Sequence, residues 1–282
     1  MTYRADAHIH LFDGGFGYSF TARQGVRIDE TACYESLQKT HDVRDALVVG
    51  YAAEPWCQSN NNFLARITRD LPWAHPTAYI DLTDPLTADH LKRLQADGFV
   101  GISIYCFDEK TMTAIEKTNT DTWQWLVEHR WLISVNSRGH YWSVWESVLQ
   151  QHKQLRVLVS HLGLPQKVSS PPDTETARAS MATVLALADY EQVHIKVSGF
   201  YGIGEPAFDY PHEPVWPYVQ LAHSTFGSSR LLWGSDFSPH LDSISFPQTF
   251  DHFRQMPFLS DDDRTDLEGQ NLTSLLRDVI TG

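Results

Sequence analysis

The sequence predicts an α/β fold, a (β/α)8 TIM barrel in regular or distorted form. Short apolar segments alternate with longer amphipathic segments along the chain, and this alternation is typical of parallel strands joined by helices. The unit of one strand and one helix occurs eight times, and eight such units close into a barrel. The 282 residues, 42% of them hydrophobic, suffice for one barrel domain over residues 1–282.

The eight predicted strands are mostly β-branched or continuous apolar runs, as expected for strands buried on both faces of a parallel sheet. In chain order they are Ala5–Phe12, Ala46–Tyr51, Thr77–Asp81, Val100–Tyr105, Leu132–Asn136, Arg156–His161, Val193–Gly199 and Leu231–Asp236. Amphipathic segments predict helices over Tyr34–Thr40, Asn61–Arg69, Ala88–Ala96, Thr122–Arg130, Trp142–Gln151, Arg178–Tyr190 and Pro214–Phe226. A last helix is predicted over Asp261–Val279.

An open, doubly wound parallel sheet is the alternative fold. That fold usually carries a glycine-rich phosphate-binding turn after its first strand. Gly14, Gly15 and Gly17 lie near this place, but the segment reads DGGFG rather than GxGxxG, and no GKS or GKT follows. We interpret these glycines as a flexible loop over the mouth of a barrel.

Composition excludes several classes of partner. The net charge of −13 and the lack of a block of Lys or Arg argue against binding to nucleic acid or to anionic membranes. Three widely spaced cysteines without a CxxC motif favour a reducing compartment. The first predicted strand begins too early for a signal peptide, and no apolar run is long enough to span a membrane. We therefore expect a cytoplasmic protein, and the sequence leaves homo-oligomer formation open.

Polar residues gather where predicted strands end. Side chains alternate along a strand, so Asp6, His8 and His10 are expected to point the same way. His161 ends the sixth strand, and Asp236 ends the eighth. Because TIM-barrel active sites lie at the carboxyl ends of the strands, these groups are predicted to meet there. The structural alternatives are a turn capped by His161 and a helix capped by Asp236.

Four motifs that contain these residues resemble the amidohydrolase superfamily. They are Asp6–His10 (DAHIH), Ser160–Gly163 (SHLG), Lys196–Gly199 (KVSG) and Trp233–Pro239 (WGSDFSP), and they follow the family's order over nearly the whole chain. The most similar branch is the group of amidohydrolase-related lactonases, which includes 2-pyrone-4,6-dicarboxylate lactonase and sugar-acid lactonases. The resemblance implies a (β/α)8 barrel that hydrolyses a lactone or a similar carbonyl substrate.

The chemistry of these residues agrees with that implication. His8, His10, His161 and Asp236 can hold one divalent ion such as Zn²⁺, which would polarise a carbonyl or acidify bound water. Asp236 would take the proton of the water and pass it to the leaving oxygen. Members of the group differ in whether they keep a metal, and without one the histidines can donate hydrogen bonds to an oxyanion. The sequence lacks the bridging lysine and the strand-seven histidine of binuclear relatives, and Lys196 is interpreted as a structural lysine in the barrel.

Substrate-binding residues are predicted at two further strand ends. Arg138 follows the fifth strand and is suited to hold a carboxylate through two hydrogen bonds, with His140 as a neighbouring donor. Tyr105 ends the fourth strand and can reach a substrate in the mouth. The predicted partner is thus a small lactone or carboxylate.

Other functions stay open at this point. A metal-dependent decarboxylase or hydratase of the same superfamily would use a similar HxH motif and a late aspartate. A lactone isomerase would move a ring rather than open it. A barrel that only binds a small ligand would have no need for the acid–base set of three histidines and Asp236.

Overall fold

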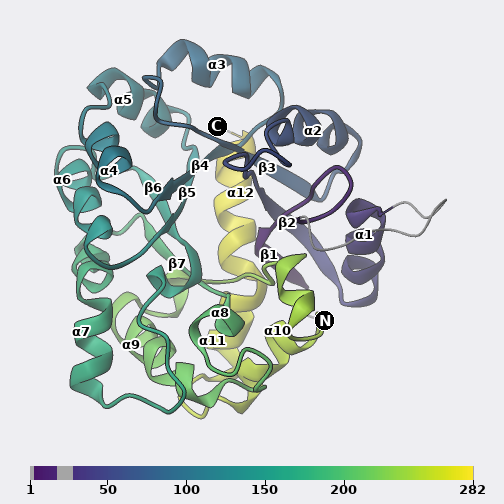
Figure 1. Cartoon of the computed structure of the whole chain (residues 1–282), viewed down its shortest axis with the longest axis vertical. Coiled ribbons are helices and arrows are strands. Elements are labelled where there is room, and N and C mark those ends of the chain that lie inside the picture. The colour runs from purple at the N-terminus through teal and green to yellow at the C-terminus, as the bar shows by residue number, and fades with distance from the viewer. Residues whose placement is uncertain (1–2, 18–27, 282) are drawn as a thin grey trace.

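The structure is a computed structural model that describes residues 3–17 and 28–281. Eight parallel strands form one sheet in the order β1 to β8, with helices around the outside (Figure 1). The strands are β1 (Arg4–Ile9), β2 (Val43–Val49), β3 (Ala74–Tyr79), β4 (Gly101–Cys106), β5 (Leu132–Ser137), β6 (Arg156–Val159), β7 (Val193–Val197) and β8 (Leu231–Trp233). The predicted (β/α)8 barrel and its eight strands are confirmed.

Helices lie between and around the strands. They are α1 (Glu30–Thr40), α2 (Asn60–Ile67), α3 (Ala88–Ala96), α4 (Glu109–Glu116), α5 (Thr120–Glu128), α6 (Ser143–Gln151), α7 (Thr174–Leu185), α8 (Phe200–Ile203), α9 (Trp216–Phe226), α10 (Gln248–Asp251), α11 (Asp261–Thr265) and α12 (Asn271–Thr281). Six begin where a preceding side chain accepts a backbone N–H: Asp29, Thr87, Asp108, Asn119, Asp173 and Ser260.

Two differences from the predicted helices have local causes. The sequence predicted neither α4 nor the short helices α8 and α10. In α4 a single residue, Ile115, is buried, so the helix has only a narrow apolar face. The last predicted helix, Asp261–Val279, is divided by a π-helical segment over Asp266–Gln270. In this segment a side chain on Gly269 would place its Cβ 2.4 Å from the carbonyl oxygen of Tyr3, so the chain passes close to the start of β1.

The barrel closes between β1 and the residues that follow β8. The backbone N–H of Asp236 donates to the carbonyl of His8 at 2.8 Å, and the N–H of His10 donates to the carbonyl of Phe237 at 2.5 Å. A Cβ on Gly234 would lie 2.8 Å from the Cβ of His8, so this close approach requires glycine. Closure therefore places His8, His10 and Asp236 beside one another.

Asp6 departs from the predicted alternation. The register between β1 and β2 shifts between Asp6 and Ile9, as at a β-bulge. The carboxylate of Asp6 accepts hydrogen bonds from the backbone N–H of Ser235 at 2.8 Å and from the hydroxyl of Tyr34 on α1 at 3.0 Å. Burial raises the pKa of Asp6 to about 7. The expectation that Asp6 shares a face with the two histidines is wrong, because the bulge turns it toward α1.

The C-terminal helix closes the amino-terminal end of the barrel. Figure 1 shows α12 in yellow, crossing the middle of the ring of helices. Its Leu272 and Leu276 belong to the same apolar cluster as Leu232 of β8, and its Asp278 pairs with Arg156 at the start of β6 at 2.9 Å. Among the described residues, no helix is long and apolar enough to cross a bilayer.

A buried polar layer lies inside the barrel above this apolar cluster. Thr77 and Ser103 share a hydrogen bond of 2.6 Å, and Lys196 donates to Ser134 Oγ at 2.6 Å. Lys196 is fully buried, and burial lowers its pKa from 10.5 to about 7. The interior of this barrel is therefore polar just below the strand ends.

Candidate active site

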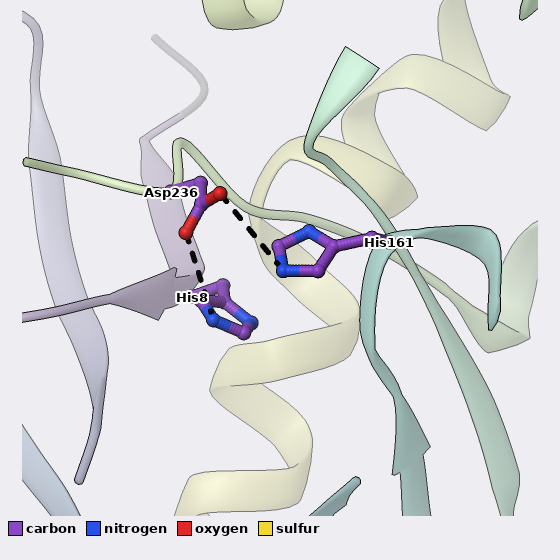
Figure 2. Close-up of side chains that lie close together, drawn as sticks. All are labelled: His8, His161 and Asp236. Carbon is purple, nitrogen blue, oxygen red and sulfur yellow. Dashed lines mark ion pairs between the residues drawn. The ribbon is translucent and has the colours of Figure 1, made fainter. Parts of the chain in front are cut away.

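The four predicted residues meet at the carboxyl end of the barrel. Asp236 Oδ1 lies 3.7 Å from His8 Nε2 and 3.6 Å from His10 Nε2, and Asp236 Oδ2 lies 3.9 Å from His161 Nε2. All four side chains are buried. Figure 2 shows the carboxylate of Asp236 between the rings of His8 and His161. One carboxylate thus faces three imidazoles.

Unusual backbone conformations aim two of these side chains into the barrel. His161 and Asp236 have positive φ angles of 53° and 59°, a left-handed region that residues other than glycine rarely occupy. Among residues 3–17 and 28–281, neither side chain makes a capping hydrogen bond to a helix, so the capping alternatives are not what the structure shows. Gly199 has a φ of +68°, and a Cβ there would lie 2.5 Å from His161 Nδ1. Such strain is typical of functional sites.

The tautomers of the two β1 histidines follow from their partners. His10 Nδ1 lies 2.7 Å from the carbonyl of Val49, which can only accept, so His10 Nδ1 carries the proton. His10 Nε2 therefore offers a lone pair to His8 Nε2 at 3.1 Å. His8 Nε2 then donates, and His8 Nδ1 accepts from Lys196 Nζ at 3.3 Å. Lys196, His8 and His10 form one hydrogen-bonded chain.

Burial decides the charges in the cluster. It lowers the pKa of His8, His10 and His161, so their rings are neutral near pH 7. Burial opposes ionisation of Asp236, but the fields of His161 and His10 and a hydrogen bond from Tyr201 outweigh it, and the pKa of Asp236 is lowered. The site therefore combines an ionised carboxylate with neutral imidazoles.

The donor atoms fit one divalent ion. Ligand atoms of His8, His161 and Asp236 all lie within 4.8 Å of one another. His10 Nε2 lies next to this set, near His8 Nε2 and Asp236 Oδ1. The distances between neighbouring ligand atoms of the four residues run from 3.1 to 3.9 Å. A tetrahedral ion with bonds of about 2.0–2.1 Å has ligand atoms about 3.3 Å apart. Neutral imidazoles and an ionised carboxylate are also the protonation states that bind metal.

An aromatic cavity of about 350 Å³ opens above the cluster. His10, His161 and Asp236 line it, and six aromatic side chains form much of its wall: Phe12, Phe16, Tyr51, Tyr105, Phe107 and Tyr201. Such a wall suits a small ring compound, with a few polar groups to orient it.

The predicted substrate-binding residues differ in their positions. Tyr105 lines the cavity as predicted. Arg138 and His140 are exposed and lie outside it. The guanidinium of Arg138 lies over the ring of Phe107 at 5.9 Å, and His140 pairs with Glu109 at 2.8 Å. A tight turn over Gly139–Trp142 follows Arg138, and a role of either residue in substrate binding stays a prediction.

Three contributors were not predicted as site residues. The hydroxyl of Tyr201 donates to Asp236 Oδ2 at 2.5 Å, and Ser198 Oγ lies 2.9 Å from His161 Nδ1. Asn136 lines the cavity from the end of β5. The strand-end argument that selected His161 and Asp236 could also have selected Asn136 and Ser198. The place of Tyr201 after the seventh predicted strand indicates an aromatic residue near the mouth, but not its hydrogen bond to Asp236.

Comparison with known proteins places this geometry in a family. A family model described as Amidohydrolase matches residues 5–277. The chain belongs to the amidohydrolase family. The resemblance that the four motifs indicated is thereby confirmed, and with it membership of a family of enzymes.

Several solved structures are similar to this chain. An amidohydrolase from Burkholderia multivorans covers 98% of this chain and 99% of its own, with a TM-score of 0.79 at 17% identity in a structure with HEPES and 0.77 at 16% in one with zinc. A probable 2-pyrone-4,6-dicarboxylic acid hydrolase from Acinetobacter baumannii gives 0.72 at 21% identity over 98% of this chain and 100% of its own. A 2,6-dihydroxybenzoate decarboxylase from Rhizobium gives 0.65 at 15% identity over 100% of each chain. These likenesses show the shared fold.

A shorter match connects the sequence to a lactonase. L-fucono-1,5-lactonase from Burkholderia ambifaria is 32% identical over 88 residues, which cover 31% of this chain and 28% of that enzyme.

Proposed function

We propose that this amidohydrolase opens the lactone ring of a small organic or sugar acid. The observation that carries the proposal is the ionised carboxylate of Asp236 among three neutral imidazoles at the floor of an aromatic cavity. The similarity to a pyrone hydrolase and to a sugar-acid lactonase supports it. Hydrolysis needs a base for water, a group that polarises the carbonyl and an acid for the leaving oxygen, and this cluster can supply each.

Asp236 would act first as a base and then as an acid. It takes a proton from water while the water oxygen bonds to the carbonyl carbon of the lactone. The ring C–O bond then breaks, and Asp236 returns the proton to the ring oxygen, which leaves the open hydroxy acid. The hydroxyl of Tyr201 holds Oδ2 of the carboxylate, so Oδ1, which faces His8 and His10, is the freer oxygen for this transfer.

We further propose that His8, His10, His161 and Asp236 hold one divalent ion, zinc. Ligand atoms of His8, His161 and Asp236 lie within 4.8 Å of one another, and His10 Nε2 lies 3.6 Å from Asp236 Oδ1. The structure of the amidohydrolase from Burkholderia multivorans contains bound zinc. When bound, the ion polarises the carbonyl and lowers the pKa of water. For His8 to bind the ion through Nε2, its proton must lie on Nδ1. The neutral amine of Lys196 can then accept a hydrogen bond from Nδ1–H. Without an ion, His8 Nε2–H remains a donor close to the cavity floor.

The test is acid release from a panel of sugar-acid and dicarboxylate lactones, followed with a pH indicator, with and without a chelator. We expect Asp236→Asn to lower kcat by about 10² to 10⁴-fold, the usual contribution of a general base. Asp242→Asn, an exposed aspartate after β8, is the matched control and should keep wild-type activity. Full activity of Asp236→Asn would refute the mechanism, and insensitivity to the chelator would refute the metal.

A decarboxylase is the second candidate, because the Rhizobium decarboxylase shares the fold over the full length of both chains. Release of CO₂ from 2,6-dihydroxybenzoate, with no turnover of any lactone, would replace the lactonase proposal with this one.

A further inference from the structure

Two polar groups in the wall of the cavity have no hydrogen-bond partner in the described part of the chain. The hydroxyl of Tyr105 and the side-chain oxygen of Asn136 are both buried, and neither finds a partner among the described residues. Both residues line the cavity that contains Asp236. Buried polar atoms in folded proteins are nearly always paired, and an unpaired one is destabilising. A pair of such atoms at the wall of a ligand cavity indicates that the ligand supplies the missing partner.

The two residues occupy neighbouring positions on adjacent strands. Tyr105 and Asn136 are direct partners in the register of β4 and β5, so their side chains leave the sheet side by side. Strand order places β4 and β5 across the barrel from β8, after which Asp236 follows. A ring that spans the cavity can therefore contact the pair at one end and Asp236 at the other.

Packing fixes the position of the Tyr105 hydroxyl. Its ring contacts the rings of Tyr51 and Tyr79, with centroid distances of 4.8 and 5.9 Å. Burial and the charge of Asp236 raise the pKa of Tyr105 well above its usual value, so it stays a hydrogen-bond donor. A preformed donor of this kind loses little freedom when it binds a ligand.

The chemistry of the pair selects its ligand. Tyr105 offers an O–H and Asn136 offers a carbonyl oxygen, so a ligand that satisfies both atoms must accept one hydrogen bond and donate another. A hydroxyl does this. An ionised carboxylate only accepts, and a methylene does neither. The surrounding aromatic rings leave room for the C–H faces of the same ring compound.

We propose that Tyr105 and Asn136 form a subsite that binds a ring hydroxyl and so selects hydroxylated lactones over unsubstituted ones. This inference rests on the proposed lactonase function and names its substrate class. Asp236 transfers the proton, while Tyr105 and Asn136 determine which ring binds.

The experiment compares rings that differ only in hydroxyl groups. The probes are a set of aldono-1,4- and aldono-1,5-lactones, with γ-butyrolactone and δ-valerolactone as the unsubstituted rings. Wild type, Tyr105→Phe and Asn136→Ala are assayed for kcat/KM on each. Tyr79→Phe is the matched control, because it removes the same atom from the same aromatic cluster outside this cavity.

We expect wild type to prefer at least one aldonolactone over its unsubstituted ring by more than about tenfold. Tyr105→Phe and Asn136→Ala should each lower kcat/KM for that aldonolactone about 10-fold or more, with little effect on the unsubstituted ring. Tyr105→Phe should also keep or raise the melting temperature, because it removes an unpaired buried hydroxyl. A merely structural hydroxyl would show the opposite, lower stability and equal loss on both rings.

The outcomes separate this inference from the proposed function. If lactones are hydrolysed but both ring types respond equally to the substitutions, the subsite is refuted and the lactonase stands. If no lactone is hydrolysed, the lactonase fails, and calorimetric titration of the same probes into Asp236→Asn protein judges the subsite. Binding of an aldonolactone that Tyr105→Phe weakens supports it, and no binding of any aldonolactone overturns it.

Discussion

Replacing Lys196 with methionine should make the protein more stable, by an amount that depends on pH. In the unfolded chain Lys196 keeps its proton up to about pH 10.5, whereas burial lowers its pKa to about 7 in the native state. Between these values the unfolded state binds more protons, so native stability rises with pH. At about 1.36 kcal/mol per pKa unit, burial of Lys196 costs about 4 kcal/mol at pH 7 and about 1.4 kcal/mol at pH 9.5. Lys196→Met removes this dependence.

The assay is urea unfolding of both proteins at a series of pH values, followed by tryptophan fluorescence. Titrating groups that do not interact with Lys196 affect both proteins alike, so the difference between them reports Lys196 together with its charged neighbours Asp236 and Asp6. We expect the advantage of Lys196→Met to shrink by about 3 kcal/mol from pH 7 to 9.5. Lys153→Met, at an exposed lysine, should show no such trend. An advantage that stays constant across this range would refute the assignment of a strongly lowered pKa to Lys196.

Three further substitutions test the site and its surroundings. Gly199→Ala would place a Cβ 2.5 Å from His161 Nδ1 and so displace that ring. We expect kcat/KM to fall at least about 10-fold and the protein to bind less metal in a metal assay. Wild-type values of both quantities would contradict this arrangement of the site. Tyr201→Phe removes a hydrogen bond that lowers the pKa of Asp236, so the acidic limb of the kcat/KM profile should move to higher pH; an unmoved limb would exclude Asp236 as the titrating base. Burial lowers the pKa of His252 to about 3, so the native state keeps it neutral while the unfolded chain protonates it below about pH 6.5. Wild type should therefore lose up to about 5 kcal/mol of stability as the pH falls from 6.5 toward 3, and His252→Phe should unfold at a lower pH in an acid titration followed by circular dichroism; equal acid midpoints would argue against this role.

The fold and the central cluster could be predicted because both depend on strands. Apolar runs reveal the eight strands, and the rule that sites form at strand ends selects His161 and Asp236. The path of the chain beyond a strand end is set by turns, whose geometry the apolar pattern does not show. Arg138 lies only one residue beyond β5, yet its side chain is exposed and is not among the residues that line the cavity.

Other features depend on partners far away in the sequence. Asp6 does not share a face with the histidines, because a bulge in β1 orients it toward Ser235 and Tyr34, which donate hydrogen bonds to it. Tyr201 donates a hydrogen bond to Asp236, and no local sequence pattern indicates this bond. Periodicity alone cannot find such features, because each requires the closed barrel.

Closure of the barrel also determines when the protein can first act. Asp6 and Ser235 are hydrogen-bonded where β1 meets the residues that follow β8, and they are 229 residues apart in the chain. His8 and His10 enter with the first strand, but Asp236 arrives only after the eighth. During synthesis one edge of the first strand therefore has no partner until the eighth strand is made. No truncated product that stops before Asp236 can contain the complete cluster. The onset of activity on the ribosome would mark the moment at which the ring of strands is joined.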